Sequence, residues 1–357
     1  MPSKFDNINA TKTGKRVLIT RFSALGDIAM TVPVIQKFVE QNPTVSVTVV
    51  SIPFMAPLFE KIPNVNFVGA DIKGKHKGLK GLIRLANELR ELGFDEIADL
   101  HNSIRSRIIR YLLRSSVEKT AVIFKDRKGR KELTRPKNKV FKPLTSMHER
   151  YAEVFEKLGY NRLDIAKPML LEKEDLLPEL KSILGEKSGV WIGVSPFSQI
   201  ASKEYPIDLL EESLQLFLKK NNTAKILFFG GKNDLEILDQ LEKNISNSIN
   251  ISKHIRFKQE INLIPHLDLM VGMDSFNGHF AAIYGIPVVT IWGATHPYAG
   301  FTPFGQPIIN SIIPDLKKYP ALPSCTHGKN VVKGYEEVMR SIKPEEVAEK
   351  IFNILKR

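Results

Sequence analysis

Short apolar runs alternate with longer amphipathic segments along most of the chain. The first run, residues 15–20, is rich in β-branched side chains and predicts a buried strand, and the pattern over residues 28–40 predicts a helix. Further strands are expected at residues 45–50, 65–68 and 96–100, and a further helix at 79–92. Alternation of this kind is typical of a parallel sheet covered by helices on both faces.

The alternation restarts after a polar, proline-containing stretch at residues 165–187. In this second half, strands are expected at residues 190–194, 225–229, 268–271 and 288–292. Helices are expected at residues 207–220, 235–241 and 279–284, with a final amphipathic helix at 343–356. Because 357 residues exceed the usual size of one domain, the pattern predicts two α/β domains.

Basic charge gathers in the first half of the chain. Residues 1–160 hold 29 Lys and Arg against 16 Asp and Glu, whereas residues 161–357 hold 23 of each, so the first half carries the whole net charge of +13. A one-sided basic field favours an anionic partner, such as nucleic acid, an anionic membrane surface or a phosphorylated substrate, and it equally fits a solubilising surface. Few aromatic residues interleave the cations of residues 105–142, which argues against a stacking platform for single-stranded nucleic acid.

Neither a membrane span nor a disulfide is expected. No apolar run reaches the roughly 18–20 residues that a span requires, and residues 1–15 are polar, unlike a signal peptide. Cys325 is the single cysteine, which suits a reducing compartment. The sequence therefore predicts a soluble cytoplasmic protein.

The turn Ser23-Ala24-Leu25-Gly26-Asp27 directly follows the first predicted strand. Open parallel sheets bind their ligands at the carboxyl ends of strands. Gly26 permits a tight turn there, and Asp27 supplies a carboxylate. That carboxylate could deprotonate a substrate hydroxyl or cap the following helix, and the residues alone leave both interpretations open.

Two loops of the second half carry groups suited to a diphosphate. Residues 195–206 contain Ser198 and Lys203, although a loop lysine is also commonly only solvated. Residues 272–282 run from a strand end into a helix, where Ser275, Asn277 and backbone N–H groups would form an anion site. No Asp-x-Asp pair and no zinc-spaced Cys/His set is present, so no metal site is expected.

In this order the motifs resemble glycosyltransferase family 9, the lipopolysaccharide heptosyltransferase family, over nearly the whole chain. The matching segments are residues 21–28 with Pro33, 99–102 with Arg105-Ser106, 148–151 with Leu158-Gly159, 203–206, 229–231, Asp274-Ser275 with His279, and 342–346. The resemblance implies a GT-B fold, that is, an α/β protein of two Rossmann-like domains whose parallel sheets face an interdomain cleft. It places an acceptor-binding domain at residues 1–170, a nucleotide-sugar-binding domain at 171–340, and at 341–357 a helix that packs back on the first domain.

The resemblance also implies an inverting, metal-independent sugar transfer. The donor would be a nucleotide sugar such as ADP-heptose, with no separate cofactor, and the acceptor an anionic glycolipid of the lipopolysaccharide core or another surface glycan. Such an enzyme would contact the inner face of the inner membrane peripherally and would bind no nucleic acid.

Roles for individual residues follow from the same resemblance. Asp27 would be the general base, and Lys203 and Ser198 would stabilise the departing diphosphate. The implied donor-binding residues are Ser198, Lys203, Gly231, Asp274, Ser275, Asn277, Gly278 and His279. The implied acceptor-binding residues are Ser23, Gly26, His101 and Arg105. Phe276 stands where the family has glycine, which predicts a reshaped donor pocket, and Tyr205 stands where it has tryptophan.

Two other function classes fit the same residues. A nucleotide-sugar epimerase on this fold would need a second acid/base carboxylate near the sugar and would act without an acceptor. A non-catalytic module that binds nucleotide or an anionic surface would tolerate Asp27→Asn.

Overall fold

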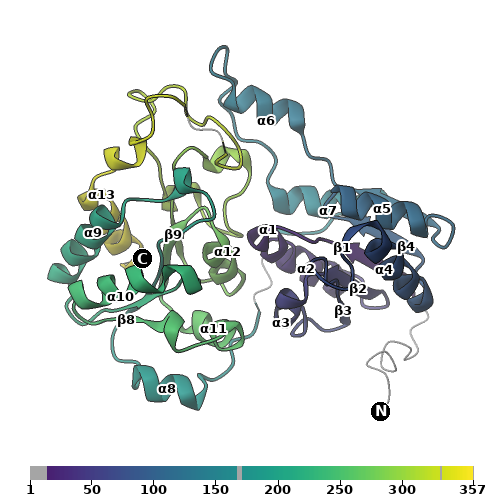
Figure 1. Ribbon diagram of the computed structural model, residues 1–357, viewed down its shortest axis with the longest axis horizontal. Coiled ribbons are helices and arrows are strands. Elements are labelled where there is room, and N and C mark those ends of the chain that lie inside the picture. The colour runs from purple at the N-terminus through teal and green to yellow at the C-terminus, as the bar shows by residue number, and fades with distance from the viewer. Residues whose placement is uncertain (1–13, 167–170, 330–331, 357) are drawn as a thin grey trace. The chain divides into compact units, whose positions relative to one another are not determined.

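The computed structural model describes residues 14–166, 171–329 and 332–356. The chain divides into two compact units, one within Met1–Lys125 and Met147–Leu171 and the other within Asp126–Ser146 and Glu172–Arg357 (Figure 1). Residues 1–13 of the polar N-terminal segment and residues 167–170 of the polar, proline-containing stretch lie outside the described residues. Within the described ranges, no helix is both long and apolar enough to cross a membrane.

The first unit is built on a parallel sheet with the strand order β3-β2-β1-β4-β5. Its strands are β1 (Arg16–Thr20), β2 (Ser46–Ser51), β3 (Val65–Gly69), β4 (Glu96–Asp99) and β5 (Lys119–Val122). Its helices are α1 (Leu25–Ala29), α2 (Val32–Gln41), α3 (Ala56–Phe59), α4 (Gly78–Leu92), α5 (Ile104–Leu113) and α7 (Met147–Leu158).

Helices cover both faces of this sheet. Leu18 of β1 packs in one cluster with Leu85 of α4 and Ile109 of α5. Elsewhere in the unit, Phe38 of α2 stacks on Phe155 of α7 with ring centroids 4.1 Å apart. The first unit is therefore the parallel sheet, covered by helices, that the alternation of apolar runs and amphipathic segments predicts.

The helix predicted over residues 28–40 is two helices, α1 and α2. Thr31 lies between them, and its Oγ1 donates to the carbonyl of Ile28 at 2.7 Å. Pro33, near the start of α2, has no N–H to continue the ladder of α1. The break ends α1 one turn after Leu25, so that Asp27 lies in a single short turn beside the sheet.

The second unit contains a parallel sheet with the order β11-β10-β9-β6-β7-β8. Its strands are β6 (Trp191–Ser195), β7 (Lys225–Phe228), β8 (Ser248–Asn250), β9 (Leu269–Met273), β10 (Val288–Ile291) and β11 (Ser311–Ile312). Its helices are α6 (Arg127–Thr134), α8 (Pro178–Leu184), α9 (Ile207–Lys220), α10 (Leu235–Asn244), α11 (Phe257–Leu263), α12 (Phe276–Ile283) and α13 (Pro344–Leu355). Helix α8 lies within the polar, proline-containing stretch of residues 165–187.

Both sheets have the connectivity of a Rossmann-like fold, which confirms the predicted fold class. In each, the chain runs outward from a central strand to one edge and then restarts on the other side of that strand. The order therefore reverses between β1 and β4 in the first unit and between β6 and β9 in the second. Such switch points are where doubly wound sheets bind ligands.

Residues 126–146 belong to the second unit, although they are expected in the first domain from the family resemblance. Lys139 Nζ donates to the carbonyls of Ala321, Leu322 and Pro323 at 2.6–3.1 Å. The N–H of Leu144 donates to the carbonyl of Tyr298 at 2.9 Å. The basic charge is accordingly shared, with 23 Lys and Arg against 15 Asp and Glu in the first unit and 29 against 24 in the second.

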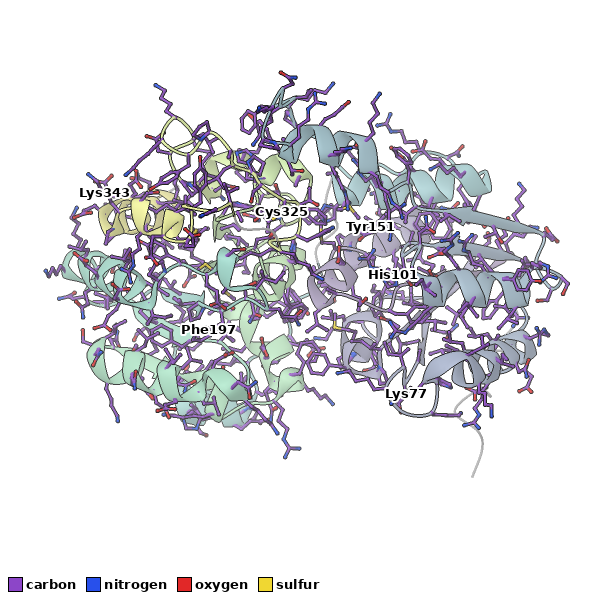
Figure 2. The ribbon with its side chains drawn as sticks, turned by 45° about the horizontal axis from the view of Figure 1, so that its top comes forward. Lys77, His101, Tyr151, Phe197, Cys325 and Lys343 are labelled. Atoms are coloured by element: carbon purple, nitrogen blue, oxygen red, sulfur yellow. The ribbon has the colours of Figure 1, made fainter. Side chains whose placement is uncertain are left out.

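The C-terminal helix α13 packs on α9, whereas the family resemblance predicts that it packs on the first domain. Val347 and Ile351 are fully buried in one core cluster with Leu214 of α9. The apolar stripe of α13 is thereby buried within the second unit. Cys325 is also buried in this unit (Figure 2).

Candidate active site

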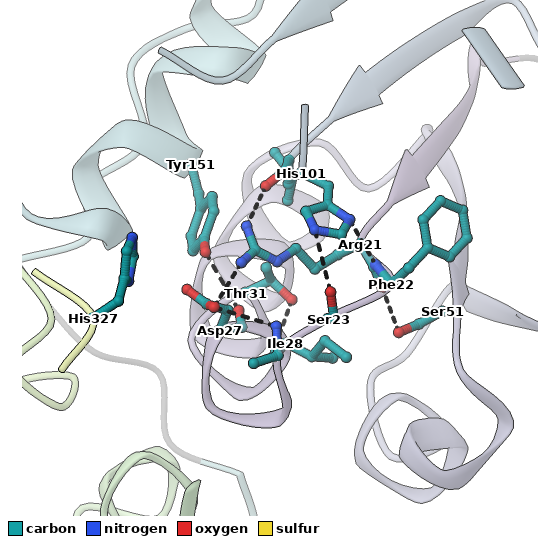
Figure 3. Close-up of polar contacts among 12 residues, drawn as sticks. Arg21, Phe22, Ser23, Asp27, Ile28, Thr31, Ser51, His101, Tyr151 and His327 are labelled. Carbon is teal, nitrogen blue, oxygen red and sulfur yellow. Dashed lines mark hydrogen bonds and ion pairs between the residues drawn. The ribbon is translucent and has the colours of Figure 1, made fainter. Parts of the chain in front are cut away.

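In the first unit, the predicted general base lies at the switch point between β1 and β4. Asp27 Oδ2 lies 2.8 Å from Nη2 of Arg21, and it also accepts the N–H of Ala24 at 3.3 Å (Figure 3). The Asp27 side chain is 21% exposed. A carboxylate that is oriented by a buried partner and remains open to solvent can accept a proton from a bound hydroxyl.

Arg21 orients this carboxylate, and the residue is absent from the predicted site. It is buried, its Nη1 donates to the carbonyl of Leu100 at 2.7 Å, and its guanidinium lies 5.7 Å from the centre of the Tyr151 ring. Tyr151 Oη in turn donates to the carbonyl of Asp27 at 3.4 Å. A charged residue directly after the apolar run of a buried strand is the signal that could have identified Arg21.

His101 is a neutral hydrogen-bond donor in this arrangement. Its Nδ1 accepts the N–H of Phe22 at 3.2 Å, so the ring proton is on Nε2, which faces Ser23 Oγ at 3.4 Å. Burial, reinforced by the charge of Arg21, lowers the pKa of His101 to about 3. Because both ring nitrogens are committed, His101 positions Ser23 and the β1 loop.

A buried carboxylate, Asp99, holds the loop that carries His101. Asp99 is fully buried at the end of β4. Its Oδ1 accepts the N–H groups of His101 and Asn102 at 2.9 and 2.8 Å, and its Oδ2 pairs with Arg110 Nε at 2.8 Å. Asp99 is therefore a positioning residue, and it is absent from the predicted site.

The structure brings together three of the four residues predicted to bind the acceptor. Ser23 and His101 lie in the loops that follow β1 and β4, and Gly26 precedes Asp27 in α1. Arg105 is exposed on the first turn of α5, and its charge is among the causes that lower the pKa of His101.

In the second unit, Lys203 and Asp274 meet at the switch point between β6 and β9. Lys203 Nζ lies 2.6 Å from Asp274 Oδ2, and the two side chains are 12% and 7% exposed. Lys203 follows β6 in a 3-10 turn, Ala201–Lys203, and Asp274 follows β9 directly. The pair fixes an ammonium group at the carboxyl edge of the sheet, where it can meet a phosphate.

Ser275 and Ser198 lie in the loops beside this pair. Ser275 Oγ is buried, and within the described part of the chain it has no hydrogen-bond partner, so it has a hydroxyl to offer a ligand. Ser198 donates its N–H to Glu204 Oε1 at 2.8 Å.

The other predicted donor residues have structural contacts of their own. Asn277 Nδ2 donates to Glu260 Oε1 at 2.9 Å, and burial raises the pKa of Glu260 to about 7. A Cβ at Gly278 would come within 3.2 Å of Val288 Cγ1, so glycine allows α12 to pack against β10. Gly231 donates its N–H to Asp234 Oδ2 at 2.7 Å, and His279 is buried in α12.

The two departures from the family pattern have local packing explanations. The Phe276 ring stacks on Phe280 at 5.6 Å and lies 5.8 Å from Phe257 of α11. Tyr205 is fully buried and donates its hydroxyl to the carbonyl of Ile342 at 2.9 Å, which anchors the chain just before α13. Phe276 thus contributes to an aromatic cluster between α11 and α12.

Among the residues described, no group of three or more His, Cys, Asp or Glu side chains is placed to hold a metal ion.

A family model and a relative of known activity each match more than half of this chain. A model of glycosyltransferase family 9 (heptosyltransferase) matches residues 82–329. The lipopolysaccharide core heptosyltransferase OpsX of Haemophilus influenzae is 23% identical over 290 residues, which cover 80% of this chain and 81% of that protein.

Solved structures share the two-sheet architecture. A glycosyltransferase family 9 protein from Veillonella parvula superposes with a TM-score of 0.74 at 19% identity, covering 96% of this chain and 97% of the other. The heptosyltransferase WaaC of E. coli, solved with ADP, superposes with a TM-score of 0.66 at 16% identity, covering 95% and 99%. The fold is therefore GT-B.

Proposed function

Because the chain belongs to glycosyltransferase family 9 and is a heptosyltransferase-like glycosyltransferase, we propose that it moves heptose from ADP-heptose to an anionic lipopolysaccharide-core acceptor. Membership of this family favours a transferase over the epimerase and the binding module. The observation that carries the proposal is the Arg21–Asp27 pair at the end of β1, since it supplies an oriented base in the unit expected to bind the acceptor.

In the proposed reaction, the acceptor hydroxyl attacks the anomeric carbon as its proton passes to the Asp27 carboxylate. The bond from the anomeric carbon to the diphosphate oxygen breaks, and ADP leaves. Attack opposite the leaving group inverts the anomeric configuration. In this reaction the first unit supplies the base, Asp27, and the second unit supplies Lys203.

Charge on the departing diphosphate would be met by protein groups without a metal ion. Lys203 supplies the cation, and the buried hydroxyl of Ser275 supplies a donor. Asp274 holds the ammonium in place before the donor binds. The WaaC structure that superposes on this chain was solved with ADP, which supports an adenine nucleotide as the donor.

Binding of the donor is tested first by thermal shift with ADP, GDP, UDP, CDP and ADP-heptose, each with and without magnesium. A ligand that binds the folded state raises the melting temperature by mass action. Stabilisation by ADP and ADP-heptose without magnesium is expected. A preference for another nucleotide would overturn the donor, and a requirement for magnesium would overturn metal independence.

Turnover is then followed as ADP release from ADP-heptose in the presence of a heptose-free lipopolysaccharide precursor, with EDTA added. The product is examined by mass spectrometry for one added heptose and by NMR for the anomeric configuration. Retention of configuration would contradict the role given to Asp27. Consumption of the donor with no acceptor present would favour an epimerase or a hydrolase.

A further inference from the structure

A solvent-exposed apolar groove runs between α4 and α5 of the first unit, helices that lie side by side in Figure 1. Its volume is about 490 Å³, and six of the seven side chains that line it are apolar or aromatic. Leu79 and Ile83 come from α4, and Ile104 and Tyr111 from α5. Their exposed fractions are 62%, 41%, 77% and 62%.

These side chains are not needed to hold the helices on the sheet. Helix α4 buries Leu82, Leu85 and Leu89, and helix α5 buries Ile109 and Leu113. A surface helix normally presents polar residues on the face opposite its buried stripe. A contiguous apolar patch on that outer face is the mark of an interaction site.

The two helices that form the groove carry many exposed basic residues. Arg107 lines it directly. The exposed basic residues on its two helices and the adjoining ends are Lys77, Lys80, Arg84, Arg90, Arg105, Arg107 and Arg114 (Lys77 is labelled in Figure 2). Helix α5 contains no acidic residue. Helix α4 has two acidic residues: Glu88, whose carboxylate is paired with Lys75 at 2.6 Å, and the exposed Glu91. The exposed basic residues therefore remain in clear excess on the two helices.

Tyr111 combines both properties in one side chain. Its ring lines the groove, and the Arg114 guanidinium lies 3.8 Å from the ring centre. Amphipathic rings and long basic side chains are the groups that reside at the boundary between acyl chains and headgroups.

We propose that the α4–α5 groove docks the protein on a bilayer surface that contains anionic phospholipid. Leu79, Ile83 and Ile104 enter the boundary between headgroups and acyl chains. The surrounding Lys and Arg side chains meet the lipid phosphates, a contact worth roughly fivefold in binding for each cation.

The charge distribution favours a bilayer over other occupants. A second copy of the chain would bring the same cationic rim against itself in a symmetric contact, and the like charges would repel. Nucleic acid would meet a single aromatic ring, Tyr111, among aliphatic side chains, which is a poor stacking surface.

The inference does not depend on which sugar is transferred, because its test measures partition and not turnover. The full-length protein is floated with vesicles of phosphatidylcholine alone or of phosphatidylcholine with phosphatidylglycerol. Binding to the anionic vesicles is expected to exceed binding to the neutral ones, and the excess should decline as salt is raised.

Groove variants separate the apolar and charged contributions. Leu79→Ser combined with Ile104→Ser should lower partition into anionic vesicles at least tenfold. The triple variant Lys80→Ala, Arg84→Ala and Arg107→Ala should lower it roughly fivefold per charge, with little effect on neutral vesicles. Thermal melting checks that each variant is folded.

Matched controls lie on the second unit. Ile308 and Ile309 are 52% and 56% exposed, so Ile308→Ser with Ile309→Ser removes similar apolar side chains elsewhere. Lys219→Ala, Lys220→Ala and Lys243→Ala remove three exposed cations. Both controls should bind vesicles like the wild type.

Three results would overturn the proposal. The wild type could remain unbound by both kinds of vesicle, or the groove variants could float as the wild type does. Alternatively, sedimentation velocity could find a wild-type dimer that Leu79→Ser with Ile104→Ser dissociates, while no form binds vesicles. That last result would assign the groove to a second copy of the chain.

Discussion

The guanidinium of Arg21 and the carboxylate of Asp27 form an ion pair, with Nη2 and Oδ2 2.8 Å apart at the carboxyl end of β1. Arg21 is tied to the β4 loop through the carbonyl of Leu100, and Tyr151 contacts the pair from α7. The orientation of Asp27 therefore depends on three separate parts of the chain, and its catalytic role can be tested together with that support.

Asp27→Asn should remove most turnover, because the amide cannot accept the acceptor proton. A general base typically contributes on the order of 10²–10⁴-fold. The thermal shift produced by ADP should be unchanged, since ADP is expected to bind the second unit. Asp164→Asn, an exposed carboxylate in the same unit, is the matched control. Full turnover in Asp27→Asn would rule out the assigned role.

Arg21→Lys should lower turnover while Asp27 remains in place. The lysine keeps the charge but cannot reach both Asp27 and the carbonyl of Leu100 with a planar fork. Arg21→Ala should also cost ~3 kcal/mol of stability, because the buried guanidinium is lost from both Asp27 and the carbonyl of Leu100. Steady-state kinetics and urea unfolding report the two effects. If Arg21→Lys is fully active, orientation by Arg21 is unimportant.

Stability should fall as the pH is lowered from 7 to 5, in part through His101. Burial lowers the folded-state pKa of His101 to about 3 from the ordinary value of 6.5, so the unfolded chain binds more protons between these values. The contribution of His101 is present above pH 6.5 and is lost as the pH falls, by about 2 kcal/mol at pH 5.

Urea unfolding at pH 7 and pH 5 measures this dependence. His101→Gln should lose less stability between the two values than the wild type does. His254→Gln changes an exposed histidine and should behave as the wild type does. An unchanged pH dependence in His101→Gln would contradict a neutral, buried imidazole.

Lys203→Ala should weaken ADP binding and turnover together, because the same ammonium meets the diphosphate in the bound donor and as it leaves. The expected loss of affinity is roughly 10- to 100-fold, as for hydrogen bonds to charged groups. Lys219→Ala removes an exposed lysine of the same unit as a control. Isothermal titration that returned wild-type affinity for Lys203→Ala would exclude the contact.

Phe276→Ala should reduce stability by about 2 kcal/mol and leave ADP affinity unchanged. The ring stacks on Phe280 and contacts Phe257, so its loss opens a void between α12 and α11. Phe54→Ala, at a half-exposed phenylalanine, is the control for removal of a ring. A change of tenfold or more in ADP affinity would show that Phe276 reaches the donor.

Much of the fold can be predicted from the sequence because strand and helix periods are local properties. The predicted strands all recur within a few residues of their expected bounds, and Leu79–Leu92 recurs within α4. Strands β5, β8 and β11 are missing from the prediction because short edge strands carry little apolar signal: β5 exposes Lys119 and Thr120. Helix α8 is missing for a similar reason, since its seven residues bury only Leu180 and Leu184.

The sequence by itself determined the two Rossmann-like halves and placed Asp27, Lys203 and Asp274 at strand ends, since these follow from order along the chain. Only the tertiary structure decided what those groups contact. Arg21 meets the loop of His101 across about eighty residues of sequence, and Lys203 meets Asp274 across about seventy. It also assigned residues 126–146 to the second unit and aligned the outer faces of α4 and α5. Such pairings depend on how strands and helices pack in space, which no local period encodes.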